Sequence, residues 1–186
     1  MITRKTKETD ITAQLDLAGG PVEIATGVGF FDHMLTAFTV HAGFGLKLSC
    51  EGDLEVDAHH TVEDCGIVLG QAMAEALGDK SGVARFGSAA IPMDEALAEA
   101  HVDISGRAFL RFEAAFSQAC AGAFELCLCE EFWRAFAHNA GLTLHLNLRY
   151  GANGHHEAEA LFKAAAHALR RALAPKEGVL STKGSI

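Results

Sequence analysis

The chain has 186 residues, enough for one domain or for two fused halves with a hydrophobic core of their own. With 49% hydrophobic and 21% charged residues, its composition is typical of a folded globular protein and excludes a disordered chain. The net charge of −9 argues against nucleic acid or an anionic membrane as the main partner, because both bind basic surfaces. The amino terminus is polar and no run approaches 18 uninterrupted apolar residues, so we expect a cytoplasmic protein without a membrane partner.

The chain repeats its own order of predicted elements. Each half has a strand-like segment, a helical pattern, a second strand-like segment and a longer helical pattern. These segments are residues 15–19, 32–42, 46–48 and 61–77 in the first half, and 102–106, 130–140, 142–146 and 157–173 in the second. Such a repeat predicts an α+β fold made of two similar halves, residues 1–90 and 91–186, that share one core.

Both halves carry the element His-His-x-x-Glu at the start of the longer helical pattern. The two copies are His59-His60-Glu63 and His155-His156-Glu159. The glutamate lies about one helical turn after the second histidine, so we expect that histidine and the carboxylate to share one face of the helix. The first histidine then points about 100 degrees away and is better placed to bind a different ion.

Histidine and carboxylate ligands suit Mn, Fe, Zn or Ni better than Ca or Mg, so the paired elements predict a metal-dependent enzyme. The repeat also aligns His33 with Glu131, which adds one ligand to each half. Taken singly, each of these residues is equally compatible with a surface or hydrogen-bonded core position. The predicted ligands of two octahedral ions are His33, His59, His60, Glu63, Glu131, His155, His156 and Glu159.

Several cations and a hydroxyl follow glycines or lie near the end of the chain. In an acidic protein they predict a small site for an anion such as phosphate, although each alone is also compatible with a solvated side chain. These residues are Arg85, Arg107, Lys163, Ser181 and Lys183. The segment over 181–184 is not a phosphate-binding loop of the GxxxxGK type, since the upstream glycine spacing is missing.

The five cysteines form no CxxC pair, which favours structural thiols. Cys127 and Cys129 alternate as residues of a strand do, so we expect both thiols on one face. A nucleophilic triad is not indicated, because no serine lies in a G-x-S-x-G element.

Several segments, in order and with matching spacing from about Arg4 to Gly184, resemble the imidazoleglycerol-phosphate dehydratase family. They are Phe30-Phe31-Asp32-His33-Met34-Leu35, Asp57-Ala58-His59-His60-Thr61-Val62-Glu63-Asp64, Met93-Asp94-Glu95-Ala96-Leu97, Ser105-Gly106-Arg107, Gly151-Ala152-Asn153-Gly154-His155-His156 and Ser181-Thr182-Lys183-Gly184. One ligand position departs from the family pattern, since Glu131 stands where the resemblance leads us to expect histidine.

The resemblance implies a lyase of histidine biosynthesis that dehydrates imidazole glycerol phosphate to imidazole acetol phosphate with two Mn ions. It implies an imidazolate and a diazafulvene-type intermediate. The implied fold is two sheet-plus-helix halves around a shared helical layer, like the second domain of ribosomal protein S5. It also implies a 24-subunit particle built from trimers, with each site completed by neighbouring subunits.

Carried over residue by residue, the resemblance implies catalytic roles for Glu8, Glu63 and Glu159, with Glu8 as the proton shuttle. The implied substrate contacts are Glu8, His33, His41, Arg85, Arg107, Lys163, Ser181 and Lys183. Two other classes remain open from the residues alone. A metal-dependent hydrolase would use the same ligands to release phosphate, and a non-catalytic protein would use the metals only to assemble.

Overall fold

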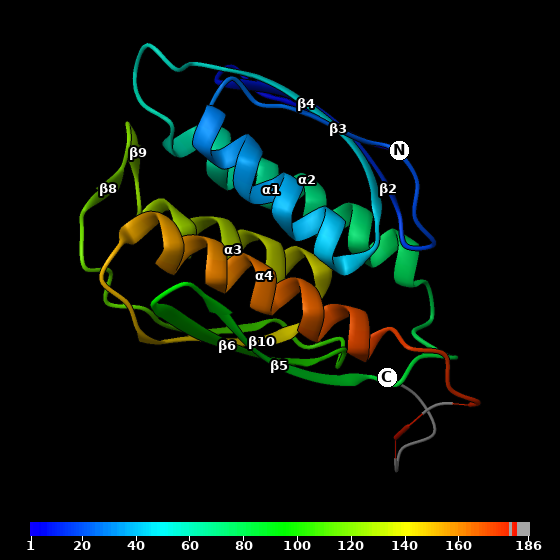
Figure 1. Ribbon diagram of the computed structural model, residues 1–186. Helices are drawn as coiled ribbons and strands as arrows, with labels where there is room; N and C mark the ends of the chain where they lie inside the picture. The colour runs from blue at the N-terminus through cyan, green and yellow to red at the C-terminus, as the bar shows by residue number, and fades with distance from the viewer. Residues whose placement is uncertain (179, 182–186) are drawn as a thin grey trace.

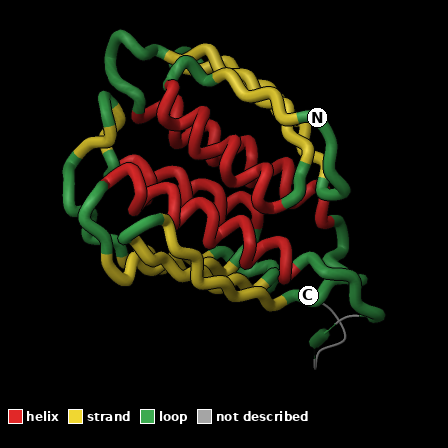
Figure 2. The backbone as a smooth tube through the Cα atoms, in the orientation of Figure 1, coloured by secondary structure: helices red, strands yellow, loops and turns green. Residues whose placement is uncertain are grey.

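The computed structural model describes residues 1–178, 180 and 181, which form two four-stranded sheets with four helices between them (Figures 1 and 2). The first sheet contains β1 (Ile2–Lys5), β2 (Thr9–Asp16), β3 (Val22–Ala25) and β4 (Gly45–Gly52). The second contains β5 (Phe86–Met93), β6 (Ala96–Asp103), β7 (Phe109–Glu113) and β10 (Thr143–Tyr150). The helices are α1 (Gly29–Ala42), α2 (His59–Leu77), α3 (Leu128–Ala140) and α4 (Gly154–Ala172).

The two halves have the same topology, which confirms the predicted duplication. Their strand orders are β1-β2-β4-β3 and β5-β6-β10-β7. In both sheets the last strand of this order runs parallel to its neighbour, and the other pairs are antiparallel. Residues 78–85 connect the halves, so a division near residue 90 falls inside β5. The second half alone carries an additional hairpin, β8 (Cys120–Ala121) and β9 (Phe124–Glu125), before α3.

The helices pair across the two halves. α1 and α2 cover the first sheet and α3 and α4 cover the second, while α2 packs on α3 and α1 packs on α4 in the middle of the molecule (Figure 1). Trp133 and Phe38 are at most 1% exposed and lie edge to face with ring centroids 5.5 Å apart, which joins the halves through one aromatic core. At the α2–α3 contact, a Cβ on Gly66 would lie 2.7 Å from the carbonyl oxygen of Phe132, so only glycine permits this close approach. Each half therefore presents one helix to the partner helix of the other half.

The helical predictions are confirmed to within three residues at each end, but two strand predictions were wrong. Residues 15–19 and 102–106 include only the last two residues of β2 and β6, and both segments continue into turns. Each turn contains a glycine with positive φ, Gly19 at 106° and Gly106 at 70°, and such a backbone ends a strand.

The prediction for the two cysteines of the 127–129 segment was also wrong. Cys127 is the N-cap residue of α3 and is exposed, whereas Cys129 is buried inside that helix, where burial raises the pKa of its thiol. The period of the helix, not that of a strand, sets their directions. Within the described residues, no helix is both long and apolar enough to cross a membrane.

Candidate metal centre

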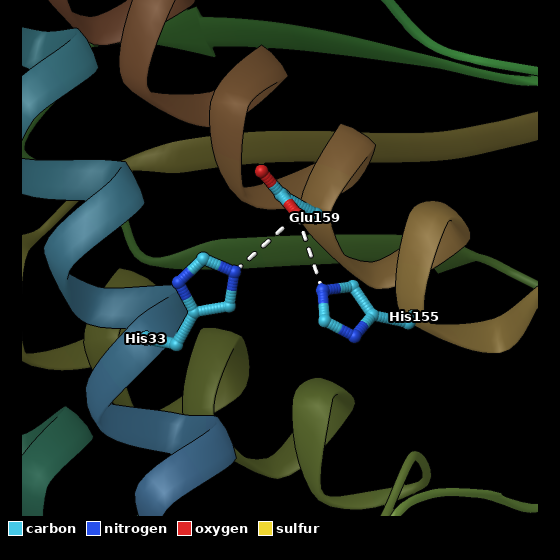
Figure 3. A group of neighbouring side chains, drawn as sticks. All are labelled: His33, His155 and Glu159. Carbon is cyan, nitrogen blue, oxygen red and sulfur yellow. Dashed lines mark ion pairs between the residues drawn. The ribbon is translucent and has the colours of Figure 1, made fainter.

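His33, His155 and Glu159 meet where α1 packs against α4 (Figure 3). The Oε2 atom of Glu159 lies 3.4 Å from Nε2 of His33 and 3.3 Å from Nε2 of His155. One ligand atom from each residue lies within 4.8 Å of the other two. Two imidazole nitrogens and a carboxylate oxygen that face a common point suit a divalent ion such as Mn, Fe or Zn. These three residues, which we call the α1–α4 centre, therefore fit the predicted metal.

A lysine keeps the carboxylate of this centre ionised. Glu159 is buried, and burial alone would raise the pKa of its carboxyl group. The Nζ atom of Lys163 lies 2.6 Å from its Oε1 atom, and together with His33 it outweighs burial and lowers that pKa. Since the lysine contacts Oε1, the Oε2 atom faces the two histidines.

The repeat places an equivalent cluster where α2 packs against α3. The Nε2 atom of His59 lies 3.6 Å from Oε2 of Glu63. Glu131 of α3 lies beside Glu63, since both carboxylates contact Arg134. Glu131 thus takes the place that His33 has beside Glu159 in the other half. Arg134 joins the two carboxylates, with Nη2 2.9 Å from Oε1 of Glu63 and Nε 3.0 Å from Oε2 of Glu131. We call His59, Glu63 and Glu131 the α2–α3 centre. A cleft of about 310 Å³ opens beside His59, and its lining includes Asp57.

The first histidine of each pair, not the second, lies beside the glutamate, so that part of the sequence prediction was wrong. Positions four apart on a helix differ by only about 40 degrees, whereas positions three apart differ by about 60 degrees. The second histidines bind other carboxylates: Nδ1 of His60 lies 3.0 Å from Oδ2 of Asp53, and Nδ1 of His156 lies 2.7 Å from Oε2 of Glu95. These hydrogen bonds raise the pKa of both histidines.

A carboxylate on Nδ1 fixes the ring and leaves Nε2 as the nitrogen that can bind a metal. The hairpin turn of each half places a further acidic side chain near Nε2 of the second histidine. Glu8, in the β1–β2 turn, lies 3.9 Å from Nε2 of His60, and Asp94, in the β5–β6 turn, lies 3.6 Å from Nε2 of His156. The duplication therefore provides two equivalent pairs of a second histidine and a hairpin acid.

Local hydrogen bonds explain why both helices begin at the paired histidines. The backbone N–H of His155 donates to Oδ1 of Asn153 at 2.9 Å, and the N–H of His59 donates to Oδ1 of Asp57 at 2.7 Å. Each acceptor lies two residues before the first histidine and satisfies a backbone donor that has no partner inside the helix.

The predicted anion-binding residues divide between two places. Arg85 binds Asp103, with Nε 2.7 Å from Oδ1, and its Nη1 donates to the carbonyl oxygen of Leu180 at 2.6 Å. Arg107 lies beside the same carboxylate, 3.8 Å from Oδ2 of Asp103. Ser181 follows Leu180 directly, whereas Lys183 lies outside the described residues. Lys163 is at the α1–α4 centre instead, where it binds Glu159.

The arginine cluster lies far from the metal centre of the same chain. The backbone N–H of Arg85 donates to the carbonyl oxygen of Ala172, the last residue of α4, whereas Glu159 lies near the first turn of that helix. At 1.5 Å per residue, Glu159 and Ala172 are about 20 Å apart along the helix axis. Among the described residues, Arg85 and Arg107 therefore lie apart from the α1–α4 centre of the same chain, whereas Lys163 lies at it.

The predicted substrate residue His41 lies in the last turn of α1, where its Nδ1 atom is 3.1 Å from Nε2 of His167 in α4. Burial lowers the pKa of both imidazoles, and nearby cations lower it further, Lys163 for His41 and Arg171 for His167. These shifts favour the neutral form of both rings, in which one ring donates the hydrogen bond and the other accepts it.

The comparisons with known proteins agree on one family. The family model described as imidazoleglycerol-phosphate dehydratase matches residues 26–169. The chain belongs to the imidazoleglycerol-phosphate dehydratase family. Dehydratases from Alkaliphilus metalliredigens and Acidiphilium cryptum are 56% and 57% identical to it, and each match covers 98% of this chain and 96% of the relative.

Solved dehydratase structures have the same fold. The crystal structure of the Staphylococcus aureus dehydratase matches with a TM-score of 0.83 and 44% identity, over 94% of this chain and 98% of that chain. The dehydratase of Pyrococcus furiosus, solved in complex with (S)-C348, matches with a TM-score of 0.88 and 38% identity over the full length of both. Members of this family are hydro-lyases that perform the dehydration step of histidine biosynthesis, and this chain is one of them.

Several residues that contact the predicted site residues were missed by the sequence prediction. Asp53 and Glu95 bind Nδ1 of the second histidines, and Asp94 lies beside Nε2 of His156. Arg134 joins the carboxylates of the α2–α3 centre, and His167 binds His41. The repeat contained a signal for the hairpin acids, because Glu8 and Glu95 each come just before the second strand of their half. No comparable signal marked Arg134. It lies one turn after Glu131, and from the sequence alone the two residues resemble an ordinary ion pair on a helix surface.

Proposed function

We propose that the chain dehydrates imidazole glycerol phosphate to imidazole acetol phosphate in the cytoplasm, at a pair of Mn ions. The observation that carries this proposal is the convergence of His33, His155 and Glu159 in a chain of the dehydratase family. The α2–α3 centre, which the repeat relates to these three residues, is proposed to supply the second group of ligands. The donor set of imidazole and carboxylate supports Mn and equally accepts Fe or Zn.

The residues proposed to hold the two ions are those of the α1–α4 and α2–α3 centres, together with His60 and His156 through their Nε2 atoms. When bound, the ions would act as Lewis acids that favour the imidazolate form of the substrate ring. That ring would expel the hydroxyl on the carbon attached to it as hydroxide, which would take up a proton and leave as water, and a diazafulvene-type intermediate would remain. Loss of a proton from the next carbon then gives an enol, which becomes the ketone.

The chain itself moves the protons and holds the phosphate. Glu8 is the proposed proton shuttle, because its carboxylate is about half exposed and lies beside Nε2 of His60. In the second half, Asp94 of the β5–β6 turn lies beside Nε2 of His156 and is exposed as well. The proposed phosphate ligands are Arg85, Arg107, Ser181 and Lys183. Binding energy at the phosphate, away from the reacting carbons, would orient the ring toward the metal centres.

Each active site is proposed to use more than one copy of the chain. The arginine cluster and the α1–α4 centre lie about 20 Å apart along α4, farther than one small phosphorylated imidazole reaches. The metal-binding end of one copy would then meet the anion-binding end of another, as in a 24-subunit particle built from trimers. The half-exposed histidines of the two metal centres, at one end of the helices, are consistent with such a contact.

An assay of the intact, Mn-loaded protein tests the reaction. With imidazole glycerol phosphate as substrate, we expect a ketone product in amounts equal to the substrate consumed, and no inorganic phosphate. Ketone and phosphate are measured in the same samples by their separate colour reactions. Phosphate release in place of ketone would support a metal-dependent hydrolase, and intact, metal-loaded particles without turnover would support a protein that uses the ions only for assembly.

A further inference from the structure

Arg134 makes the two metal centres chemically different. Its guanidinium contacts Glu63 and Glu131 together, and Nη2 and Nε both bind Oε2 of Glu131. A guanidinium held by two carboxylates in this way is a strong, oriented ion pair.

The α1–α4 centre has no such bridge among the described residues. Of the two oxygens of Glu159, Lys163 binds Oε1, and Oε2 faces the two imidazoles. The third ligand of this centre is His33, and its ion-pair partner among the described residues is Glu159, not a cationic side chain. In the α2–α3 centre the third ligand is Glu131, and its Oε2 atom is already bound by Arg134. Only the α1–α4 residues converge within 4.8 Å among the residues described, in agreement with this difference.

The duplication shows which residue creates the difference. His33 and Glu131 are equivalent positions, and three residues later the first half has Thr36 where the second half has Arg134. Thr36 donates its hydroxyl to the backbone carbonyl of Asp32 at 2.7 Å, inside its own helix. The first half therefore presents a histidine and an uncharged threonine where the second presents a glutamate and an arginine.

We propose that Arg134 sets unequal metal affinities for the two centres. In the metal-free protein it occupies the carboxylates of the α2–α3 centre, and a divalent ion binds there only when the guanidinium moves away from Glu63. The α1–α4 centre then fills first. Glu131 thus acts as the anchor of Arg134 until the second ion arrives. This inference rests on the proposed dinuclear function.

Equilibrium dialysis of the intact assembled protein against Mn²⁺ tests the inference, with bound ions per chain counted over a range of free Mn²⁺. We expect two binding steps whose dissociation constants differ by about tenfold, because one guanidinium charge beside Glu63 opposes the second ion. Arg134→Gln removes the charge, and in this variant the two dissociation constants should differ by no more than about threefold. Arg134→Lys keeps the charge and should retain most of the gap.

Arg149→Gln is the matched control, because Arg149 is exposed on β10 and lies 3.8 Å from Glu99, in a separate pair. This variant should keep the wild-type gap. Equal affinities in the wild type, or an Arg134→Gln variant with an unchanged or wider gap, would overturn the role of Arg134 while leaving a dinuclear centre intact. Fewer than two ions per chain at saturation would instead contradict the dinuclear function, and the inference with it.

Discussion

Replacing Glu159 with glutamine is expected to remove one Mn ion per chain and to lower kcat/KM by about a thousandfold or more. The amide keeps the shape of the side chain but loses the negative charge that faces His33 and His155. It also leaves Lys163 without the carboxylate that lies 2.6 Å from its Nζ atom, so a positive charge remains at the metal centre. Metal content and ketone formation, measured on the same preparation, should fall together.

Glu99→Gln controls for the loss of a carboxylate elsewhere in the second half. Glu99 lies on β6 and contacts only Arg149 in the ion pairs found among the described residues. Surface pairs of this kind contribute about 0 to 1 kcal/mol, so metal content and activity should stay near wild type. Full metal content in Glu159→Gln, at unchanged thermal stability, would remove Glu159 from the ligand set.

Replacing Gly87 with alanine is expected to destabilise the second half strongly. Gly87 lies in β5 against α4, and a Cβ atom there would lie 1.9 Å from the carbonyl oxygen of Ala168 and 2.7 Å from the backbone nitrogen of Ala172. Both neighbours are backbone atoms, so relief requires that the strand and the helix separate. We expect about 3 kcal/mol or more of lost stability, or roughly 6 to 12 °C in the thermal midpoint.

Gly29→Ala is the matched control, since Gly29 begins α1 and an added Cβ would meet no atom within 4 Å. Its thermal midpoint should stay the same or rise slightly, because alanine favours the helix more than glycine does. A Gly87→Ala midpoint within 2 °C of wild type would show that β5 is not held against α4 as tightly as the structure has it.

The repeat was the strongest signal in the sequence because it appears at two levels. The order of apolar patterns predicted two similar halves, and the paired His-His-x-x-Glu elements lie at the start of the same helix in each half. Side chains close together in the chain, such as His155 and Glu159, need only one helix to meet, so their contact follows from local structure.

Contacts between distant segments could not be predicted in this way. The pairing of α1 with α4 brings His33 to Glu159, and the pairing of α2 with α3 brings Arg134 to Glu63. Both pairings join opposite halves and depend on how the aromatic core around Trp133 packs. Helix geometry alone favours the first histidine of each pair as the neighbour of the glutamate, but the partners of His60 and His156, Asp53 and Glu95, come from segments outside the helix and could not be predicted from it.

The claim that one active site needs two copies of the chain is tested most directly with mixed particles. Glu159→Gln has an impaired metal end and Arg107→Ala an impaired anion end, and each variant alone should be nearly inactive at substrate concentrations far below KM. When the two are co-expressed in equal amounts, random assembly should restore up to about a quarter of the wild-type activity, because some sites combine two intact ends. Mixed particles, verified by mass, that remain as inactive as the separate variants would contradict a site shared between copies.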